Sequence, residues 1–173
     1  MKKNTKLYFL YFLSFVQIIY CSDYFSFSSS IILKIKGPGN SMLYSQSSVY
    51  PDEVIVNGNN TSLTGATCFL DKEENVVNLK WNYPINNIKF QRCINITEID
   101  FSNFYSKNFT DMSNMFRDCS LLKSINFFNF DTSQATDMNN MFANCLLLTT
   151  LNLSNFNTIK VKNMHFCFVA ANH

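Results

Sequence analysis

The sequence predicts an α/β solenoid, in which each coil contains one short helix and one short strand. The first observation is a unit of 26 residues that occurs twice in succession between residues 110 and 161. Self-similarity at a fixed period of this size is typical of repeat architectures. The second observation is that two side-chain periodicities follow one another within each unit.

The two copies share both their length and the order of their motifs. The first reads TDMSNMFRDCSLLKSINFFNFDTS from Thr110, and the second reads TDMNNMFANCLLLTTLNLSNFNT from Thr136. A weaker copy precedes them, with Cys93 lying 26 residues before Cys119, and a partial copy ends at His173. The chain therefore holds roughly three and a half units, near the minimum of about three for a stable stack.

Each unit begins with the spacing of a helix face and continues with that of a strand. Thr110 and Asp111 precede the helical pattern and are expected to cap its free amides. Ile125 and Phe127 then alternate with Ser124, Asn126 and Phe128, which predicts a strand, and residues 151–153 repeat this pattern. The apolar residues at i, i+3, i+4 and i+7 of the predicted helix are Met112, Met115, Phe116 and Cys119.

The quoted phrases resemble the 26-residue surface-protein repeat of the BspA-like leucine-rich-repeat family. The resemblance covers residues 84–173 and implies leucine-rich-repeat-like coils. It also implies a secreted or surface-displayed protein, often linked to adhesion. That family has no common catalytic residue that could be transferred to this chain.

Residues 1–22 have the features of a secretory signal peptide. A basic start with Lys2, Lys3 and Lys6 leads into an apolar run at residues 7–20. This run is shorter than the ~18–20 residues needed to span a bilayer, so cleavage near Cys21 is favoured over an uncleaved anchor. Contact with a membrane is expected only through an uncleaved signal.

Residues 23–83 do not follow the 26-residue period and predict a β-rich cap over the first coil. Strands are expected at residues 31–36, 54–56 and 76–81. The first two end at turn signals, Gly37-Pro38-Gly39 and Asn57-Gly58. A small independent domain is the alternative for this segment.

Equivalent residues of successive coils are expected to form columns. Asn103, Asn129 and Asn155 predict a column of buried amides that bond the backbone of the turns. Phe104, Phe130 and Phe156 predict a column of core aromatics. Cys93, Cys119 and Cys145 predict a third column, in which small buried thiols fill the core.

Composition and motifs argue against catalysis, cofactors, metals and nucleic acid. No two cysteines have zinc-ligand spacing, and His165 and His173 are the only histidines. No Ser-His-Asp or Cys-His arrangement and no phosphate-binding glycine loop is present. Without the three signal lysines, 11 basic residues stand against 12 acidic ones, and no basic cluster remains for a phosphate backbone.

The outward residues of the predicted strands form the candidate binding face, in which Phe128 is the only large apolar side chain. A solvated sheet face without a ligand is the alternative. The residues of this face are Glu98, Asp100, Ser102, Ser124, Asn126, Phe128, Thr150, Asn152 and Ser154. Acceptor sequons for N-glycosylation, expected in turns, lie at Asn59, Asn60 and Asn108.

The function predicted from these observations is binding, without catalysis, to a protein or a cell-surface ligand outside the cell. The alternative is a truncated or decayed fragment of a larger repeat surface protein with only a structural role. Its basis is the absence of a polar capping repeat after the last coil. For the same reason, end-to-end self-association through the last coil is expected.

Overall fold

The computed structural model describes residues 28–47 and 49–169. The predicted signal at residues 1–22 lies outside the described residues and stays a prediction. Within the described ranges, no helix is long and apolar enough to cross a membrane. We call residues 84–109, 110–135 and 136–161 the first, second and third units, and residues 162–169 the last segment.

The prediction of an α/β solenoid with one helix per coil is wrong. Residues 28–47 and 49–169 contain no helix, and their strands form one six-stranded and two two-stranded sheets instead of the single parallel sheet of a solenoid. The strands are β1 (Ser29–Lys36), β2 (Gly39–Met42), β3 (Gln46–Ser47), β4 (Glu53–Val56), β5 (Asn59–Asn60), β6 (Thr67–Leu70), β7 (Glu74–Trp81), β8 (Ile88–Lys89), β9 (Ile96–Asp100) and β10 (Ser124–Asn126).

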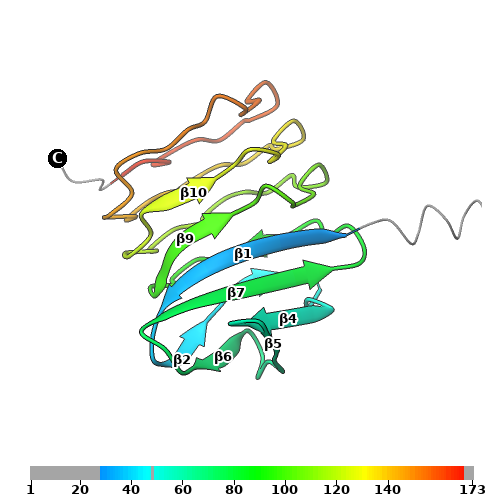
Figure 1. The fold of residues 1–173 in the computed structure, drawn as a ribbon. Helices are drawn as coiled ribbons and strands as arrows, with labels where there is room; N and C mark the ends of the chain where they lie inside the picture. Colours follow the sequence, from blue (N-terminus) through cyan, green and yellow to red (C-terminus); the bar gives the residue numbers. More distant parts are fainter. Residues whose placement is uncertain (1–27, 48, 170–173) are drawn as a thin grey trace, which may run out of the picture.

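The six-stranded sheet joins the N-terminal segment to the units, in the order β10-β9-β1-β7-β4-β5 (Figure 1). Strand β1 pairs antiparallel with both β7 and β9, whereas β9 and β10 pair in parallel. Ile31, Leu33 and Ile35 of β1 are buried and alternate with more exposed residues, so one face of the sheet covers the core. The predicted strands at residues 31–36, 54–56 and 76–81 are confirmed as parts of β1, β4 and β7.

Local turn chemistry explains the hairpin between β4 and β5. Asn57 and Gly58 have φ values of 51° and 87°. Positive φ at both central residues gives the two-residue turn whose twist matches the flanking strands. The turn predicted at Asn57-Gly58 is therefore confirmed.

Residues 112–119 form successive turns in place of the predicted helix. Asn114 and Asp118 have φ values of 56° and 61°, and the equivalent Asn140 and Asn144 have 55° and 60°. A right-handed helix cannot continue through left-handed residues, and Asn and Asp enter that region more readily than most other residues. The apolar residues predicted for the helix face are nevertheless buried, namely Met112, Met115, Phe116 and Cys119.

The amides that a helix would use internally donate instead to the following unit. In the second unit the donors are the amides of Met112, Asn114, Phe116 and Asp118. Their acceptors are the carbonyls of Asp137, Asn139, Met141 and Ala143, at 2.8–2.9 Å. The third unit repeats the arrangement toward the last segment, so the units stack one above another (Figure 1).

Asp111 forms a turn and does not cap a helix, contrary to the prediction. Its Oδ1 accepts the amide of Ser113 at 2.8 Å, and Asp137 accepts the amide of Asn139 in the same way. Such side-chain bonds to the amide two residues on are typical of turn-forming Asp and Asn.

The strand predicted at residues 151–153 is absent, so that prediction is wrong. The segment that follows the turns is therefore less regular in the third unit than in the first two.

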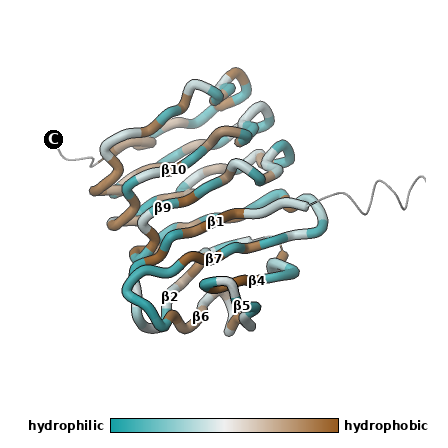
Figure 2. The backbone as a smooth tube through the Cα atoms, viewed as in Figure 1, coloured by the Kyte–Doolittle hydropathy of each residue, from teal (hydrophilic) through white to brown (hydrophobic). Residues whose placement is uncertain are grey.

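Phenylalanine rings stack through the interior of the units. Phe90, Phe116, Phe142 and Phe168 lie on one another with centroids 5.5–5.9 Å apart. The predicted aromatic column of Phe104, Phe130 and Phe156 is also present, with centroid distances of 6.5 and 6.2 Å. Hydrophobic stretches recur at the left-hand bends of the stacked units (Figure 2).

The N-terminal segment packs directly on the first unit. Strand β3 pairs with β8, and the Trp81 ring contacts the Phe104 ring edge-on at 6.0 Å. Lys89 of β8 is 8% exposed and forms a 2.9 Å ion pair with Asp111 of the second unit. The N-terminal segment is thus in direct contact with the first unit, and its assignment as a cap stays a prediction.

Candidate functional site

The nine residues of the candidate binding face come together on the solvent side of the six-stranded sheet and its continuation. Ser124 of β10 lies opposite Glu98 of β9, and Asn126 lies opposite Asp100. The Asn126 amide also donates to the Asp100 carboxylate at 3.0 Å. All nine side chains are exposed or half-buried, and those of the third unit lie beyond the last strand.

Three of these residues also shape the chain where it leaves the face. Asp100, Asn126 and Asn152 each accept the backbone amide two residues ahead, at 2.7, 3.1 and 3.0 Å. A turn of this type bends the backbone locally, so these side chains have a structural role as well as an exposed position. Substituting them would change the shape of the face together with its chemistry.

Phe128 is the dominant apolar group of the face, with 71% of its surface exposed. Its amide is bonded to Asn126, and its carbonyl accepts the Asn155 side-chain amide at 2.9 Å. The ring therefore projects from a backbone that is held on both sides. This placement is that of a surface residue, not of a core residue.

The same face continues onto the N-terminal segment, which the sequence did not indicate. Lys34 of β1 lies opposite Glu98, and their side chains form a 2.8 Å ion pair. The hydrogen bond and charge of Glu98 raise the pKa of Lys34. Ile32 lies opposite Asp100, and exposed Val76 of β7 follows in the next strand. The alternation in residues 31–36 marks Ile32 and Lys34 as outward, but it cannot show that they pair with β9.

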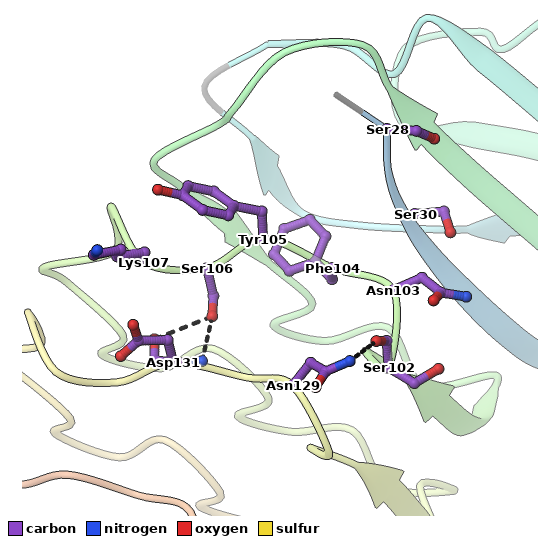
Figure 3. Close-up of a pocket in the computed structure, with 10 residues that line it drawn as sticks. All are labelled: Ser28, Ser30, Ser102, Asn103, Phe104, Tyr105, Ser106, Lys107, Asn129 and Asp131. Carbon is purple, nitrogen blue, oxygen red and sulfur yellow. Dashed lines mark hydrogen bonds between the residues drawn. The ribbon is translucent and has the colours of Figure 1, made fainter. Parts of the chain in front are cut away.

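A hollow of about 710 Å³ opens where β1 begins and β9 ends (Figure 3). Hydroxyl and amide groups dominate its lining, with one lysine, one carboxylate and the ring of half-exposed Tyr105. Its lining residues are Ser28, Ser30, Ser102, Asn103, Phe104, Tyr105, Ser106, Lys107, Asn129 and Asp131. Of these, only Ser102 belongs to the predicted binding face.

Hydrogen bonds between units hold the floor of this hollow. The Ser106 hydroxyl accepts the Asp131 amide at 2.7 Å and donates to the Asp131 carbonyl at 3.0 Å. Hydrogen bonds from the Ser133 amide and hydroxyl lower the pKa of Asp131, and the charge of Lys107 adds to this effect. The hollow therefore presents a carboxylate and a lysine among neutral polar groups.

The asparagine column has the predicted side-chain amide bonds at Asn129 and Asn155 but not the predicted burial. Asn129 donates to the Ser102 carbonyl, as drawn in Figure 3, and Asn155 donates to the Phe128 carbonyl. Asn103, Asn129 and Asn155 are all exposed, however, because the column lies on the outer side of the bend. In the sequence, the 26-residue spacing between Asn103 and Asn129 indicated that these two residues would lie next to each other at this edge of the hollow.

The sequon asparagines Asn59, Asn60 and Asn108 are exposed. Asn59 and Asn60 form β5 and do not lie in a turn, while Asn108 lies in a turn before the second unit, as predicted. Their modification stays a prediction.

The cysteine side chains fill the core, as predicted. All five described cysteines are buried, and the thiols of Cys119 and Cys145 donate to the carbonyls of Phe90 and Phe116 at 3.0 Å. Burial raises the pKa of Cys93 and of Cys145 to about 12, so these thiols stay protonated at neutral pH. Among residues 28–47 and 49–169, no group of three His, Cys, Asp or Glu side chains is placed to hold a metal.

Comparisons with known proteins bear on the units and not on the N-terminal segment. A family model described as "Mycoplasma protein of unknown function, DUF285" matches residues 86–173, which is about half of the chain. No curated protein and no solved structure matches the chain. The matched residues include the three units' turns, strands β9 and β10, and the whole predicted binding face. On this match, the chain belongs to the DUF285 family.

Proposed function

We propose that this protein is a non-catalytic binding protein, secreted or displayed at the cell surface, whose outward face contacts another protein or a cell-surface ligand. The observation that carries the proposal is Phe128, which is 71% exposed on a hydrogen-bonded backbone. Aromatic side chains on rigid supports are the usual anchors of protein interfaces. The extracellular location rests on the predicted signal and on the resemblance of the repeat to surface proteins.

The surroundings of Phe128 support a role in recognition. Neighbouring positions carry small polar side chains such as Ser124 and Ser154, which can form the polar rim around an apolar anchor. Lys34, Glu98 and Asp100 add both signs of charge to the same surface. The proposed contact area therefore spans the three units and β1.

The chemistry of the described side chains supports binding over catalysis. His165 lies in the last segment, and the hollow beside β1 contains no histidine or cysteine. The buried thiols are kept protonated, which disfavours a role as nucleophiles. General acid–base and nucleophilic chemistry both need such groups within hydrogen-bonding reach of one another.

The test compares Phe128→Ala with a matched control, Phe69→Ala. Phe69 lies on β6, outside the six-stranded sheet, and is 67% exposed. The labelled chain and both variants would be applied to an array of extracellular protein domains and to intact cells. We expect Phe128→Ala to weaken binding roughly tenfold, or ~1.4 kcal/mol, while Phe69→Ala binds like the unmodified chain. Equal losses in both variants, or a lower melting temperature for Phe128→Ala, would contradict the proposal.

A second candidate function is that of a structural element in a longer repeat assembly. The observation that favours it is the open outer side of the last segment, where Met164, Phe166 and Phe168 are exposed. Mass spectrometry of the native protein would test it, because a species extending the 26-residue period beyond His173 is then expected.

A further inference from the structure

We infer that a lysine-lined hollow at one end of the outward face binds a carboxylate side chain, so the protein partner contacts this face with an acidic segment. The hollow has a volume of about 400 Å³ and lies where β1 ends and β7, β9 and β10 begin, on the left-hand side of the sheet in Figure 1. We call it the lysine hollow, because Lys34, Lys36 and Lys123 line it. The inference rests on the proposed function, since the lysine hollow shares Lys34 and Glu98 with the outward face.

A β-bulge shapes the sheet at the lysine hollow. The pairing of β1 with β9 shifts register between Lys34 and Ile35, which leaves Thr97 as an extra residue on β9. A bulge of this kind bends its strand and redirects the neighbouring side chains. The Thr97 carbonyl accepts the Lys123 amide at 2.8 Å, and its hydroxyl donates to the Lys34 carbonyl at 3.1 Å. The bulge therefore holds the backbone from which two of the three lysines project.

The charges of the lysine hollow are not balanced. Glu98 forms a 2.8 Å ion pair with Lys34, and the charge of Glu74 also acts on Lys34. Lys36 and Lys123 are exposed, and neither takes part in an ion pair among residues 28–47 and 49–169. Three lysines and two glutamates leave a net charge of +1 in the lining. An anionic group is therefore the complementary ligand.

Lys36 and Lys123 are placed to share one anion. They lie on either side of β9, since the Lys36 amide bonds the Asn95 carbonyl and the Lys123 amide bonds the Thr97 carbonyl. With neighbouring strands about 4.8 Å apart, the two backbones are of the order of 10 Å from one another. The flexible four-carbon stem of each lysine can span half of this distance. A carboxylate between the two ammonium groups can accept a hydrogen bond from each of them.

The remaining lining favours a protein side chain over an acidic sugar. Val76 lies opposite Lys34 and is 49% exposed, so it offers apolar surface to the methylene groups of Glu or Asp. The Thr97 hydroxyl and the Asn75 amide already bond carbonyls of this chain. Among the described residues that line the lysine hollow there is no aromatic ring. The hydroxyl groups and ring of a sugar would therefore find few partners here, whereas an acidic peptide segment needs only the lysines and the apolar wall.

The experiment titrates the ¹⁵N-labelled chain with a peptide of six glutamates at pH 7 and low ionic strength. We expect saturable shifts of the amide signals of Lys36, Thr97 and Lys123. The double variant Lys36→Gln with Lys123→Gln should bind about tenfold more weakly, because it removes both unpaired cations.

Two further variants separate local recognition from overall charge. The matched control, Lys160→Gln with Lys162→Gln, removes the same charge from exposed residues outside the lysine hollow and should bind like the unmodified chain. Glu98→Gln releases Lys34 from its ion pair and should strengthen binding about threefold. A peptide of six glutamines is the negative control, and polygalacturonate at the same carboxylate concentration represents an acidic sugar.

Three results would overturn the inference: no saturable shifts with hexaglutamate, equal weakening in both double variants, or stronger binding of polygalacturonate than of hexaglutamate. The array test of Phe128→Ala is independent of this titration. Absence of hexaglutamate binding together with a partner that depends on Phe128 would overturn this inference alone. Hexaglutamate binding at the lysine hollow without such a partner would support the anion site and count against the proposed function.

Discussion

The N-terminal segment and the units both consist of β-structure, but they satisfy their backbone hydrogen bonds in different ways. Strand β1 exchanges bonds with antiparallel neighbours on both sides. In the units, alternate amides of the turns around Asn114 and Asp118, which have positive φ, donate to the next unit, and the amides of Thr136 and Lys162 donate back to the preceding one. In the first arrangement each inner strand is paired along its length with two neighbouring strands, whereas in the second the hydrogen bonds between units run through turns.

This difference also appears in the side chains that stabilise each region. The N-terminal sheet buries aliphatic residues such as Leu33 and Val77 on alternate positions. The units bury stacked aromatic rings that contact their equivalents 26 residues away. Core substitutions in the units should therefore weaken two junctions at once.

Truncation of a central ring should have the largest effect. Phe116 is fully buried between Phe90 and Phe142, so Phe116→Ala is expected to cost about 4 kcal/mol of unfolding free energy. The same change at the half-exposed end ring, Phe168→Ala, should cost under about 1 kcal/mol. Denaturant unfolding of both variants measures the contrast, and equal losses would mean that stacking does not stabilise the units.

Breaking the ion pair between the first and second units should have the next largest effect on stability. Asp111→Ala leaves the buried Lys89 ammonium without its anion and should cost about 2 kcal/mol. The exposed Lys34–Glu98 pair is the control, since Glu98→Ala should change stability little. Chemical denaturation at pH 7 distinguishes the two cases.

The same ion pair should make the free energy of unfolding depend on pH in the acid range. Desolvation opposes ionisation of Asp111, but hydrogen bonds from Ser113 and Lys89 outweigh it and hold the pKa below its ordinary 3.8. A lowered folded pKa stabilises the protein above the unfolded value, and this contribution is lost as pH falls below 3.8. The acid loss should be smaller in Asp111→Ala; an unchanged acid limb would contradict the assignment.

A smaller effect on stability is expected from substitutions in the left-handed turns that stand in place of the predicted helix. Asn114→Val forces a β-branched residue into positive φ and should cost about 1–2 kcal/mol. Asn114→Gly removes the same side chain but accepts this conformation, so it should be close to neutral. Thermal unfolding of the two variants separates backbone strain from side-chain loss, and equal effects would refute the role of φ.

The ionisation of the buried cysteine thiols is expected to have the smallest effect on stability at neutral pH. Burial raises the pKa of Cys93 and Cys145 to about 12, so the folded state holds these protons more tightly than the unfolded state does. Their contribution is complete below pH 9.0, the ordinary value, and is lost as pH rises toward 12. Iodoacetamide at pH 8 should leave the five described cysteines unmodified in the native protein and modify all five after unfolding; native labelling would contradict their burial.

Much of the local structure could be predicted because it depends on neighbouring residues. The apolar runs at residues 31–36 and 76–81, which end at turn signals, predict β1 and β7, and Asn57-Gly58 predicts the hairpin turn. The helix prediction failed because spacing at i, i+3, i+4 and i+7 also fits turns that bury the same side chains. The asparagine or aspartate at positions 114, 118, 140 and 144 was the signal against a helix, since these residues favour left-handed turns.

The sequence by itself determined which residues recur every 26 positions and therefore which side chains share a column, including the outward set around Phe128. Only the tertiary structure decided that β1 pairs with β9, which extends this face onto the N-terminal segment and creates the hollow beside it. It also decided which backbone amides of each unit donate to the next unit and which to the preceding one. The physical reason is that strand pairing and amide direction depend on backbone groups, which are the same for nearly every residue and leave no periodic trace in side-chain identity.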